Sequence, residues 1–380
     1  MEKKHTEPRT EFGRKVFGPF LAAYMRWLRD EIQALKPEKV FFFSRDGYIM
    51  KRCYDMMEAS SPIGIPSQYV YFSRKSLRTP LLCTSLTYER IFDHLSWQRF
   101  ISYGEVLSYW GLSLDETRMP ASEAAHTIPF ENLAKDEFLR SVFESYKNLI
   151  VSRSREQFDA LRAYLTEIGL RGKVVIVDIG WHGSMQLALE TFLAHCGIEA
   201  QVSGLYVGIG TPRNLKGTAK GFLYNGETDH RRSSVLCFLG VVEKLFQCFE
   251  GSTVSYKLTP EGVEVIKAKY EFATDAPEVE TIRLIQEGAV AQVKEVGCAD
   301  TDAFLAFGRN PSSKWLSIFS SFYNLDGGVK LFFLPQKPLY RFSLKEFILA
   351  LNQSSWKTGF MKKAFRLPLP YFFLYKILKK

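Results

Sequence analysis

The chain has 380 residues, of which 46% are hydrophobic, and a formal net charge of +9. This length and composition are sufficient for a full hydrophobic core and exclude a disordered chain; they suggest one elaborated domain or two to three smaller lobes. Aromatic residues make up 14% of the chain, which hints at a surface that meets apolar material.

The positive charge is concentrated near the C-terminal end. No acidic residue follows Glu346, and the segment 347–380 contains seven basic residues: Lys357, Lys362, Lys363, Arg366, Lys376, Lys379 and Lys380. These seven leave residues 1–346 with a formal charge of only +2 out of +9. The sequence therefore predicts no continuous basic groove for nucleic acid, and the tail is the expected basic partner surface.

The six cysteines form no Cys-x-x-Cys pair, and no His lies at metal-ligand spacing from any of them. The N-terminal residues contain no apolar stretch of the kind found in secretory signals. No run approaches the roughly 18 apolar residues of a membrane span. These features predict a reduced, cytoplasmic protein.

The first predicted element is an amphipathic helix within an N-terminal segment, residues 1–38. Apolar residues recur at helical spacing between Glu11 and Leu35, so the helix is expected to cover a sheet. A short, wholly apolar run at 40–43 follows and is typical of a strand buried on both faces. The turn after it leads into a helix over roughly 48–58.

A second strand is predicted at 69–73. Residues 80–168 then show aromatic-rich helical pieces and no convincing strand, which predicts an inserted helical cap. Strand character resumes at 173–178, and further elements are predicted as a helix at 184–195, a strand at 204–209, an edge strand at 221–224 and a helix at 236–249.

The alternation of short apolar strands with helices favours an α/β fold with a Rossmann-type, doubly wound parallel sheet. The predicted core comprises residues 39–79 and 169–260 and is split by the cap at 80–168. Residues 261–380 are expected to form a mainly helical C-terminal region.

Polar side chains gather where the predicted core strands end. In doubly wound sheets, ligands bind beyond the carboxyl ends of the strands. These ends carry Ser44-Arg45-Asp46, Ser73-Arg74-Lys75 and Asp178, which converge on one crevice if the strands are parallel neighbours. Helix N-termini at two of the turns attract phosphate, and Arg45, Arg74 and Lys75 add positive charge. The pattern predicts a crevice that binds a ligand with two phosphate groups.

Each of these residues also has a structural interpretation. Arg74 and Lys75 can be solvated loop charges, and Asp46 before Gly47 can be a turn residue or a helix cap. Asp178 is harder to dismiss, because a carboxylate ending a Val-Val-Ile-Val strand needs a partner, a metal ion or a function to offset its desolvation.

The segment after Asp178 offers further candidates. Trp181 and His182 are either ordinary loop residues or a stacking surface and a proton donor. Glu243 is either a structural partner for a basic residue or part of the site. The predicted substrate-binding set is completed by the small residues Gly47, Gly180, Gly183 and Ser184. The dinucleotide fingerprint G-x-G-x-x-G is absent, so no organic cofactor is expected.

Residues 40–47, Val-Phe-Phe-Phe-Ser-Arg-Asp-Gly, resemble the first motif of the haloacid-dehalogenase (HAD) superfamily, an apolar strand ending in Asp-x-Asp-Gly. Residues 69–73 resemble the second motif, and the cap and the acidic strand end at Asp178 are also similar to that HAD-like fold. Ser44 stands where the nucleophilic Asp of the family would lie. A Ser without an adjacent base cannot easily form the covalent phosphate intermediate, so ordinary phosphatase chemistry is not expected.

Four segments together, 44–48, 71–76, 178–186 and 243–250, look more like a bacterial surface-polysaccharide group with this modified fold, over roughly residues 12–256. The resemblance implies a glycosyltransferase of capsule or O-antigen synthesis. Such an enzyme moves a 5-phospho-ribofuranosyl group from phosphoribosyl pyrophosphate (PRPP) to a lipid-linked or growing glycan. A separate phosphatase then removes the 5-phosphate.

An inverting displacement of this kind needs a carboxylate to take the proton of the acceptor hydroxyl, and electrostatic help for the departing pyrophosphate. Asp178, Asp46 and His182 are the predicted catalytic residues. Asp46 and Asp178 are also candidate Mg²⁺ ligands, and the roles of base and ligand stay open between them. The rival functions are a HAD-like phosphatase and a non-catalytic subunit of a polysaccharide assembly complex.

The segment 365–378 is apolar and aromatic and lies among the basic residues of the tail. It is too short to span a bilayer, and Pro368 and Pro370 interrupt any long helix. We therefore expect the tail to dock peripherally on the inner face of the cytoplasmic membrane, and residues 357–380 to be removable without loss of the fold. The alternative is a terminal element packed on the core with solvated lysines.

Overall fold

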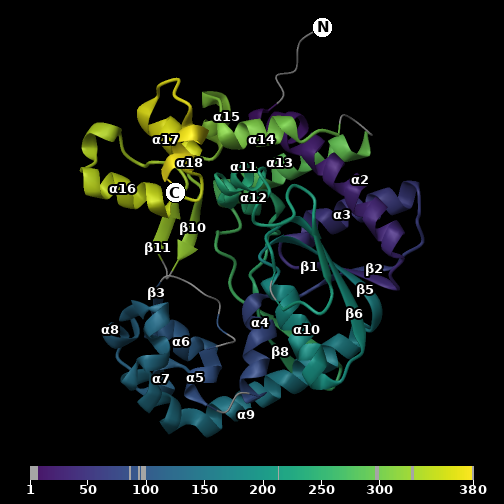
Figure 1. The fold of residues 1–380 in the computed structure, drawn as a ribbon, viewed down its shortest axis with the longest axis vertical. Helices are drawn as coiled ribbons and strands as arrows, with labels where there is room; N and C mark the ends of the chain where they lie inside the picture. Colours follow the sequence, from purple (N-terminus) through teal and green to yellow (C-terminus); the bar gives the residue numbers. More distant parts are fainter. Residues whose placement is uncertain are drawn as a thin grey trace.

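The computed structural model describes residues 7–84, 87–92, 95, 100–212, 214–295, 299–326 and 329–378. Its centre is a five-stranded parallel sheet of order β2-β1-β5-β6-β7 (Figure 1). The strands are β1 (Lys39–Phe43), β2 (Ser67–Val70), β5 (Gly172–Trp181), β6 (Ala200–Ile209) and β7 (Thr218–Gly221). The prediction of an α/β fold with a parallel sheet is confirmed.

Both faces of the sheet are buried, because alternate residues of the strands enter two different cores. Phe42 and Val177 belong to one core, and Phe41 and Ile176 belong to the other. The first core contains residues of the helices α2 (Gly18–Leu35), α3 (Gly47–Ser60), α12 (Leu239–Phe246) and α13 (Pro277–Lys294). The second contains residues of α9 (Glu137–Glu167) and α10 (Ser184–Cys196). The wholly apolar strand sequences reflect this two-sided burial.

The N-terminal helix is interrupted where a second helix crosses it. α1 (Pro8–Phe12) leads through a π-helical turn, η1 (Gly13–Phe17), into α2, whereas one uninterrupted helix was expected. A Cβ on Gly13 would lie 2.2 Å from the carbonyl oxygen of Ile285, and one on Gly288 would lie 2.5 Å from that of Thr10. Glycines on both helices therefore allow α13 to lie directly against this segment.

Four strands have bounds that differ from the prediction by three residues or more. β6 begins at Ala200, four residues before the expected Gly204, because its pairing with β5 begins at Gly172. β2 ends at Val70, three residues before the expected Ser73, because its partner β1 ends at Phe43, the residue opposite Val70. β5 continues past Asp178 to Trp181, because β6 extends beside it as far as Ile209. The edge strand β7 lies at 218–221 rather than 221–224 and pairs with residues 203–206 of β6.

The inserted cap has a hydrophobic core of its own, which includes Trp110 and Phe143. The helix α4 (Arg74–Arg78) precedes the cap and packs in the second sheet core through Leu77. The elements of the cap are short: η2 (Thr79–Thr84), α5 (Tyr88–Ile91), β3 (Phe100–Ser102), α6 (Tyr103–Tyr109), α7 (Leu114–Thr117), α8 (Ala121–Ala124), β4 (Thr127–Pro129) and η4 (Phe130–Lys135). The expectation that the cap contains no strand is wrong, since β3 and β4 form an antiparallel pair. Strands of three residues are too short to show a period in the sequence.

The 31-residue helix α9 connects the cap with the sheet. Leu139 and Phe143 in its first half belong to the cap core, whereas Leu161 and Leu165 in its second half pack under the sheet. One continuous helix therefore belongs to both cores and joins the cap to the sheet.

The region after β7 is mainly helical, as expected, but it also contains two antiparallel hairpins. The hairpins are β8 (Thr253–Thr259) with β9 (Gly262–Lys267), and β10 (Tyr323–Asp326) with β11 (Val329–Phe332). The helix expected at 236–249 is divided into α11 (Arg232–Leu236) and α12. The other helices are α14 (Asp302–Arg309), α15 (Ser313–Ile318), η5 (Leu339–Arg341), α16 (Leu344–Gln353), α17 (Lys357–Phe365) and α18 (Tyr371–Leu378). Within the described ranges, no helix combines the length and apolarity that crossing a membrane requires.

Candidate active site

A crevice opens at the carboxyl end of β1. β2 and β5 lie on opposite sides of this strand, so the chain leaves its end toward different sides of the sheet, and such a switch point is where doubly wound sheets bind ligands. Phe43 pairs with Val70, and Phe42 pairs with Val177, so the ends of β1 and β2 lie level with Asp178 of β5, which continues to Trp181.

Two connected hollows make up the crevice. An inner pocket of about 80 Å³ is lined by Asp46, Asp178 and His182, together with Ser44, Arg74, Gly180, Trp181, Gly183, Ser184 and Glu243. An outer cleft of about 680 Å³ is lined by Arg45, Ser73 and Lys75 and shares Ser44, Asp46, Arg74 and Glu243 with the inner pocket. Of the predicted site residues only Gly47 lines neither; it is buried against Phe42, where a Cβ would lie 3.1 Å from the Cβ of Phe42.

Asp178 is buried within β5, where it pairs with Tyr206 of β6, and its exposed fraction is 8%. Burial raises the pKa of Asp178 to about 6, although hydrogen bonds from the N–H groups of Ile179 and Gly180 and the charge of Arg74 favour the ionised form. Asp178 is therefore a carboxylate that titrates close to neutral pH.

Asp46 occupies the N-cap position of α3, but its side chain makes no capping hydrogen bond. Asp46 thus lies in the turn and at the cap position, as one interpretation expected, but its side chain does not act as the cap. Burial, followed by the charges of Asp178 and Glu243, raises the pKa of Asp46 to about 8 against the opposing effects of Arg45 and Arg74. Two carboxyl groups of the crevice thus have different proton affinities because their surroundings differ.

Glu243 is the third carboxyl group of the inner pocket. Trp181 donates a hydrogen bond from Nε1 to Glu243 Oε1 at 3.0 Å, and burial raises the pKa of Glu243. The Trp181 ring is 4% exposed and lies parallel to Tyr224, with 6.3 Å between the ring centroids. Glu243 and Tyr224 thus fix the orientation of the Trp181 ring, and its role as a stacking surface stays a prediction.

The loop after β5 adopts a conformation that suits glycine. Gly180 has φ +101°, and a Cβ there would lie 2.5 Å from the carbonyl oxygen of Gly208. Trp181 also has a positive φ of 75°, an arrangement that costs energy and tends to occur at functional sites. His182 follows and lines the inner pocket; partial burial, together with the charges of Arg74 and Arg232, lowers its pKa against the opposing effect of Glu227.

Two predicted ligands, Ser44 and Ser73, use their hydroxyl groups inside the protein. Ser44 Oγ donates to the carbonyl oxygen of Phe72 at 3.1 Å and accepts from the N–H of Phe72 at 3.2 Å. Ser73 Oγ donates to the carbonyl oxygen of Thr253 at 2.6 Å and accepts from the N–H of Ser76 to cap α4. These contacts join the ends of neighbouring strands and hold the crevice wall.

The three predicted cations differ in their surroundings. Arg45 approaches Glu271, with 3.6 Å between Nη1 and Oε2, and Lys75 Nζ donates to Ser108 Oγ of the cap at 2.8 Å. Arg74 is exposed at the start of α4 and lines both hollows. In the described part of the chain, its guanidinium forms no hydrogen bond and no ion pair. It remains available to an anion.

Sequence reasoning missed a second charged group in the outer cleft. Lys244 is only 4% exposed and forms an ion pair with Glu271, whose Oε1 also accepts from Gln247 Nε2 at 2.7 Å. Lys244 and Gln247 lie in the segment 243–250, which resembled a family motif. Nothing in the sequence connected them with Glu271, which follows β9.

The carboxyl groups of the inner pocket are candidate ligands for Mg²⁺. In the described parts of the chain, no three His, Cys, Asp or Glu side chains are grouped so that they could hold a metal ion. Asp46 and Asp178 nevertheless repel one another when ionised, and Mg²⁺ is commonly bound by one or two carboxylates together with substrate phosphates. The residues therefore fit a magnesium ion that arrives with a phosphate ligand.

No family model matches the chain, and no curated protein matches it either.

Proposed function

We propose that the crevice transfers a 5-phospho-ribofuranosyl group from PRPP to a hydroxyl group of a glycan, with inversion at the anomeric carbon. The observation that carries this proposal is the pair of buried carboxyl groups, Asp178 and Asp46, beside the available guanidinium of Arg74. A carboxylate base, a proton donor and a cation at one switch point are the groups that such a displacement needs.

The donor carries a 5-phosphate and a pyrophosphate, so it requires anion-binding groups at two places. The N-termini of α3 and α10 have no side-chain caps, so the positive ends of both helices face the crevice without a side-chain partner, although the N–H of Tyr48 in α3 donates to the carbonyl oxygen of Arg45 at 3.3 Å. Arg74 lies at the opening shared by both hollows, and Arg45 and Lys75 line the outer cleft. These features support binding of a ligand with two separated phosphate groups.

In the proposed reaction, the acceptor oxygen attacks the anomeric carbon of the ribosyl group while the bond to pyrophosphate breaks. Asp178, ionised at pH 7, takes the proton of the acceptor hydroxyl. Asp46, mainly protonated at pH 7, donates a hydrogen bond to the departing pyrophosphate. A Mg²⁺ ion that arrived with the donor would be held by the donor phosphates and by ionised carboxylates, and it would supply charge neutralisation for the pyrophosphate. Asp46 would then be ionised, and the ion would replace its hydrogen bond to the pyrophosphate.

Several finer features belong to the same proposal. The order of β2, β1 and β5 and the insertion of the cap after β2 support a HAD-like arrangement around Ser44. In that family position the chain has a serine whose hydroxyl group is engaged by Phe72, which disfavours a phosphatase. The acceptor is a lipid-linked or growing glycan of capsule or O-antigen synthesis in the cytoplasm, and a partner phosphatase removes the 5-phosphate.

The test is to incubate the protein with PRPP and a synthetic glycan acceptor and to measure released pyrophosphate. We expect release that depends on the acceptor, and no appreciable phosphatase activity on sugar phosphates with magnesium. Phosphatase turnover that disappears in Ser44→Ala would overturn the proposal and favour a HAD-like phosphatase. Absence of either activity, with no thermal shift from PRPP, would favour a non-catalytic subunit.

A further inference from the structure

The exposed apolar side chains of the protein are concentrated in its C-terminal region. Of sixteen large apolar side chains that are exposed among the described residues, ten lie between 339 and 378. They are Leu339, Tyr340, Leu344, Ile348, Leu349, Leu367, Leu369, Phe373, Ile377 and Leu378. We call these ten side chains the C-terminal apolar surface. Scattered apolar residues are normal on proteins, but a concentration of this kind indicates an interaction site.

These side chains come from neighbouring elements. α17 contacts both α16 and α18, and the three helices lie together at one end of the molecule (Figure 1). A groove of about 570 Å³ is lined on one side by the segment 335–340 and on the other by Lys363 and Arg366. The groove therefore brings η5 beside the turn that carries Leu367 and Leu369.

The two most exposed side chains of this surface lie in η5 and at the start of α16, and others flank the turn before α18. Tyr340 is 81% exposed and Leu344 is 77% exposed, at the start of α16. Leu367 and Phe373, which flank the Pro368-to-Pro370 turn, are 54% and 61% exposed. Side chains this exposed contribute nothing to the core, and they lower the solubility of the protein. They therefore indicate a binding partner that covers them.

Basic residues surround the C-terminal apolar surface. Exposed Lys345, Lys363, Arg366 and Lys376 lie on or beside α16, α17 and α18. Glu346 is the only acidic residue after Asp326 in the sequence, and it is engaged by Ser343 and by Lys337, whose Nζ lies 3.3 Å from Oε2. Lys357 is not part of this surface, because its Nζ donates to the carbonyl oxygens of Leu351, Asn352 and Ser354.

The opposite side of the same helices belongs to the main core. Trp356, Phe360 and Tyr371 are at most 2% exposed and pack with residues of the sheet core. Deletion of residues 357–380 would remove Phe360 and Tyr371 from this core and uncover Trp356, which argues against the expectation that this segment can be removed without loss of the fold. The tail is both packed on the core and exposed, on opposite faces.

We propose that the C-terminal apolar surface docks the protein on an anionic phospholipid membrane. Exposed Leu, Phe and Tyr side chains enter the headgroup boundary, while the surrounding Lys and Arg residues meet the anionic leaflet. A second copy of this chain fits less well, because an isologous contact would place one cationic surface against another. The inference does not depend on the proposed activity, because none of its residues lines the inner pocket or the outer cleft.

The experiment is sedimentation of the intact protein with vesicles of phosphatidylglycerol or of phosphatidylcholine at low salt. We expect binding to the anionic vesicles that is at least tenfold tighter than to the neutral ones and that weakens as salt is added. The charge variant Lys363→Glu/Arg366→Glu and the apolar variant Leu344→Ser/Leu367→Ser should each weaken binding at least tenfold. The matched control Lys257→Glu/Leu258→Ser alters an exposed cation and a 53% exposed leucine on β8 and should bind as the wild type does.

Circular dichroism and melting temperature establish that each variant is folded; all four altered C-terminal side chains are exposed. As a second measurement, a polarity-sensitive dye at Phe373→Cys should shift its emission on anionic vesicles, whereas a dye at Leu258→Cys should not. Equal vesicle binding by the wild type and both C-terminal variants would overturn the proposal. So would a concentration-dependent dimer that Leu344→Ser/Leu367→Ser dissociates, in place of vesicle binding.

Discussion

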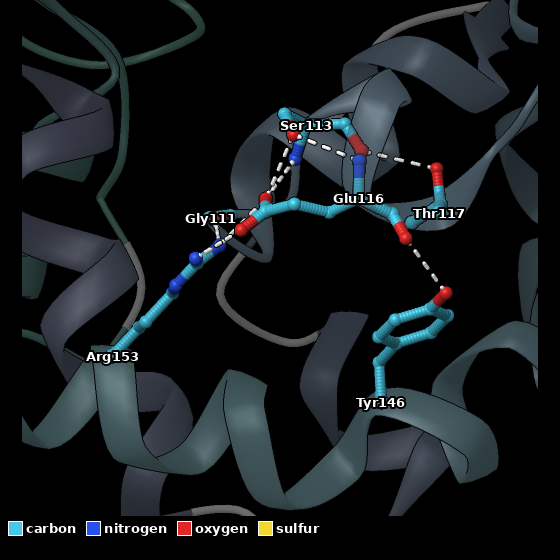
Figure 2. A network of polar contacts seen from close by, with 6 residues as sticks. All are labelled: Gly111, Ser113, Glu116, Thr117, Tyr146 and Arg153. Carbon is cyan, nitrogen blue, oxygen red and sulfur yellow. Dashed lines mark hydrogen bonds and ion pairs between the residues drawn. The ribbon is translucent and has the colours of Figure 1, made fainter.

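Two groups of charged residues in this chain behave in opposite ways. In the cap, Glu116 is held by Arg153 and Ser113, while Tyr146 donates from its hydroxyl group to the carbonyl oxygen of Glu116 at 2.9 Å (Figure 2). The hydrogen bond from Arg153, followed by those from Ser113, lowers the pKa of Glu116 to about 2. In the crevice, burial raises the pKa of Asp178 to about 6 and that of Asp46 to about 8.

The two groups differ in how far neighbouring residues satisfy their charges. The cap network satisfies each charge with a neighbouring group, so the fold favours the ionised carboxylate. The crevice holds carboxyl groups close to one another and leaves Arg74 available, so the fold opposes ionisation of Asp46 and Asp178. Such an arrangement costs stability and is typical of sites that need a ligand or a proton transfer.

The largest expected effect is on catalysis by Asp178→Asn. This change keeps the shape of the side chain and removes the base, so transfer should fall by about 10²-fold or more while the protein stays folded. Steady-state transfer rates and a melting curve measure the two parts. Glu116→Gln is the matched control and should keep activity within a few-fold. If Asp178→Asn were about as active as the wild type, Asp178 would be a structural residue, like Glu116 of the cap.

The pH dependence of kcat/KM sharpens the same comparison. Asp178 acts ionised, so activity should fall as the pH drops through about 6; Asp46 acts protonated, so activity should fall as the pH rises through about 8. A rate profile from pH 5 to 9 should therefore be bell-shaped, with a loss of about tenfold one pH unit beyond each limb. In Asp46→Asn the alkaline limb should disappear. An alkaline limb that persists in this variant would rule out Asp46 as the proton donor.

Donor binding is expected to depend on Arg74 and not on Arg153. Arg74→Ala should raise the KM for PRPP by about tenfold, the scale of one charge-assisted contact, and reduce the rise in melting temperature that PRPP causes. Arg153→Ala removes the partner of Glu116 and should lower stability without changing the KM. If Arg74→Ala leaves both the KM and the thermal shift unchanged, the phosphate groups bind elsewhere.

The smallest effect is on the pH dependence of stability, where the two groups should differ in sign. A carboxyl group whose pKa is raised by folding destabilises the protein increasingly as the pH rises from the unfolded value near 4 toward its folded value. Asp46→Asn should therefore raise the melting temperature at pH 8 by about 2 °C or more, with no gain near pH 4. Glu116 has a lowered pKa, so its contribution is present above the unfolded value and lost as the pH falls through about 2. Glu116→Gln should accordingly lower the melting temperature at pH 7.

The crevice was largely predictable because it depends on local signals. Apolar runs locate β1 and β5, and polar residues at their ends identify Ser44, Asp46 and Asp178. The rule that parallel strands end at one edge then predicts their convergence. The register that places these residues level with one another is not specified by the wholly apolar strand sequences, and it depends on the pairing of β1 with β2 and β5.

The remainder depends on contacts between distant segments. The inward orientation of Trp181 results from a positive φ and from Glu243, 62 residues later. The pairing of Lys244 with Glu271 depends on where β9 ends. The two faces of α18 depend on packing against the core, because its sequence is apolar on every side. No period in the sequence encodes these contacts.

Transfer of a 5-phospho-ribofuranosyl group by the crevice is tested most directly by following the 5-phosphate. PRPP labelled in that phosphate should be incubated with the glycan acceptor and either the wild type or Asp178→Asn, and the products separated. We expect the label to be retained in the glycan, with one pyrophosphate released per transfer, and we expect both products to be lost in Asp178→Asn. Label released as inorganic phosphate, or a labelled glycan formed equally well by Asp178→Asn, would contradict the proposed transfer.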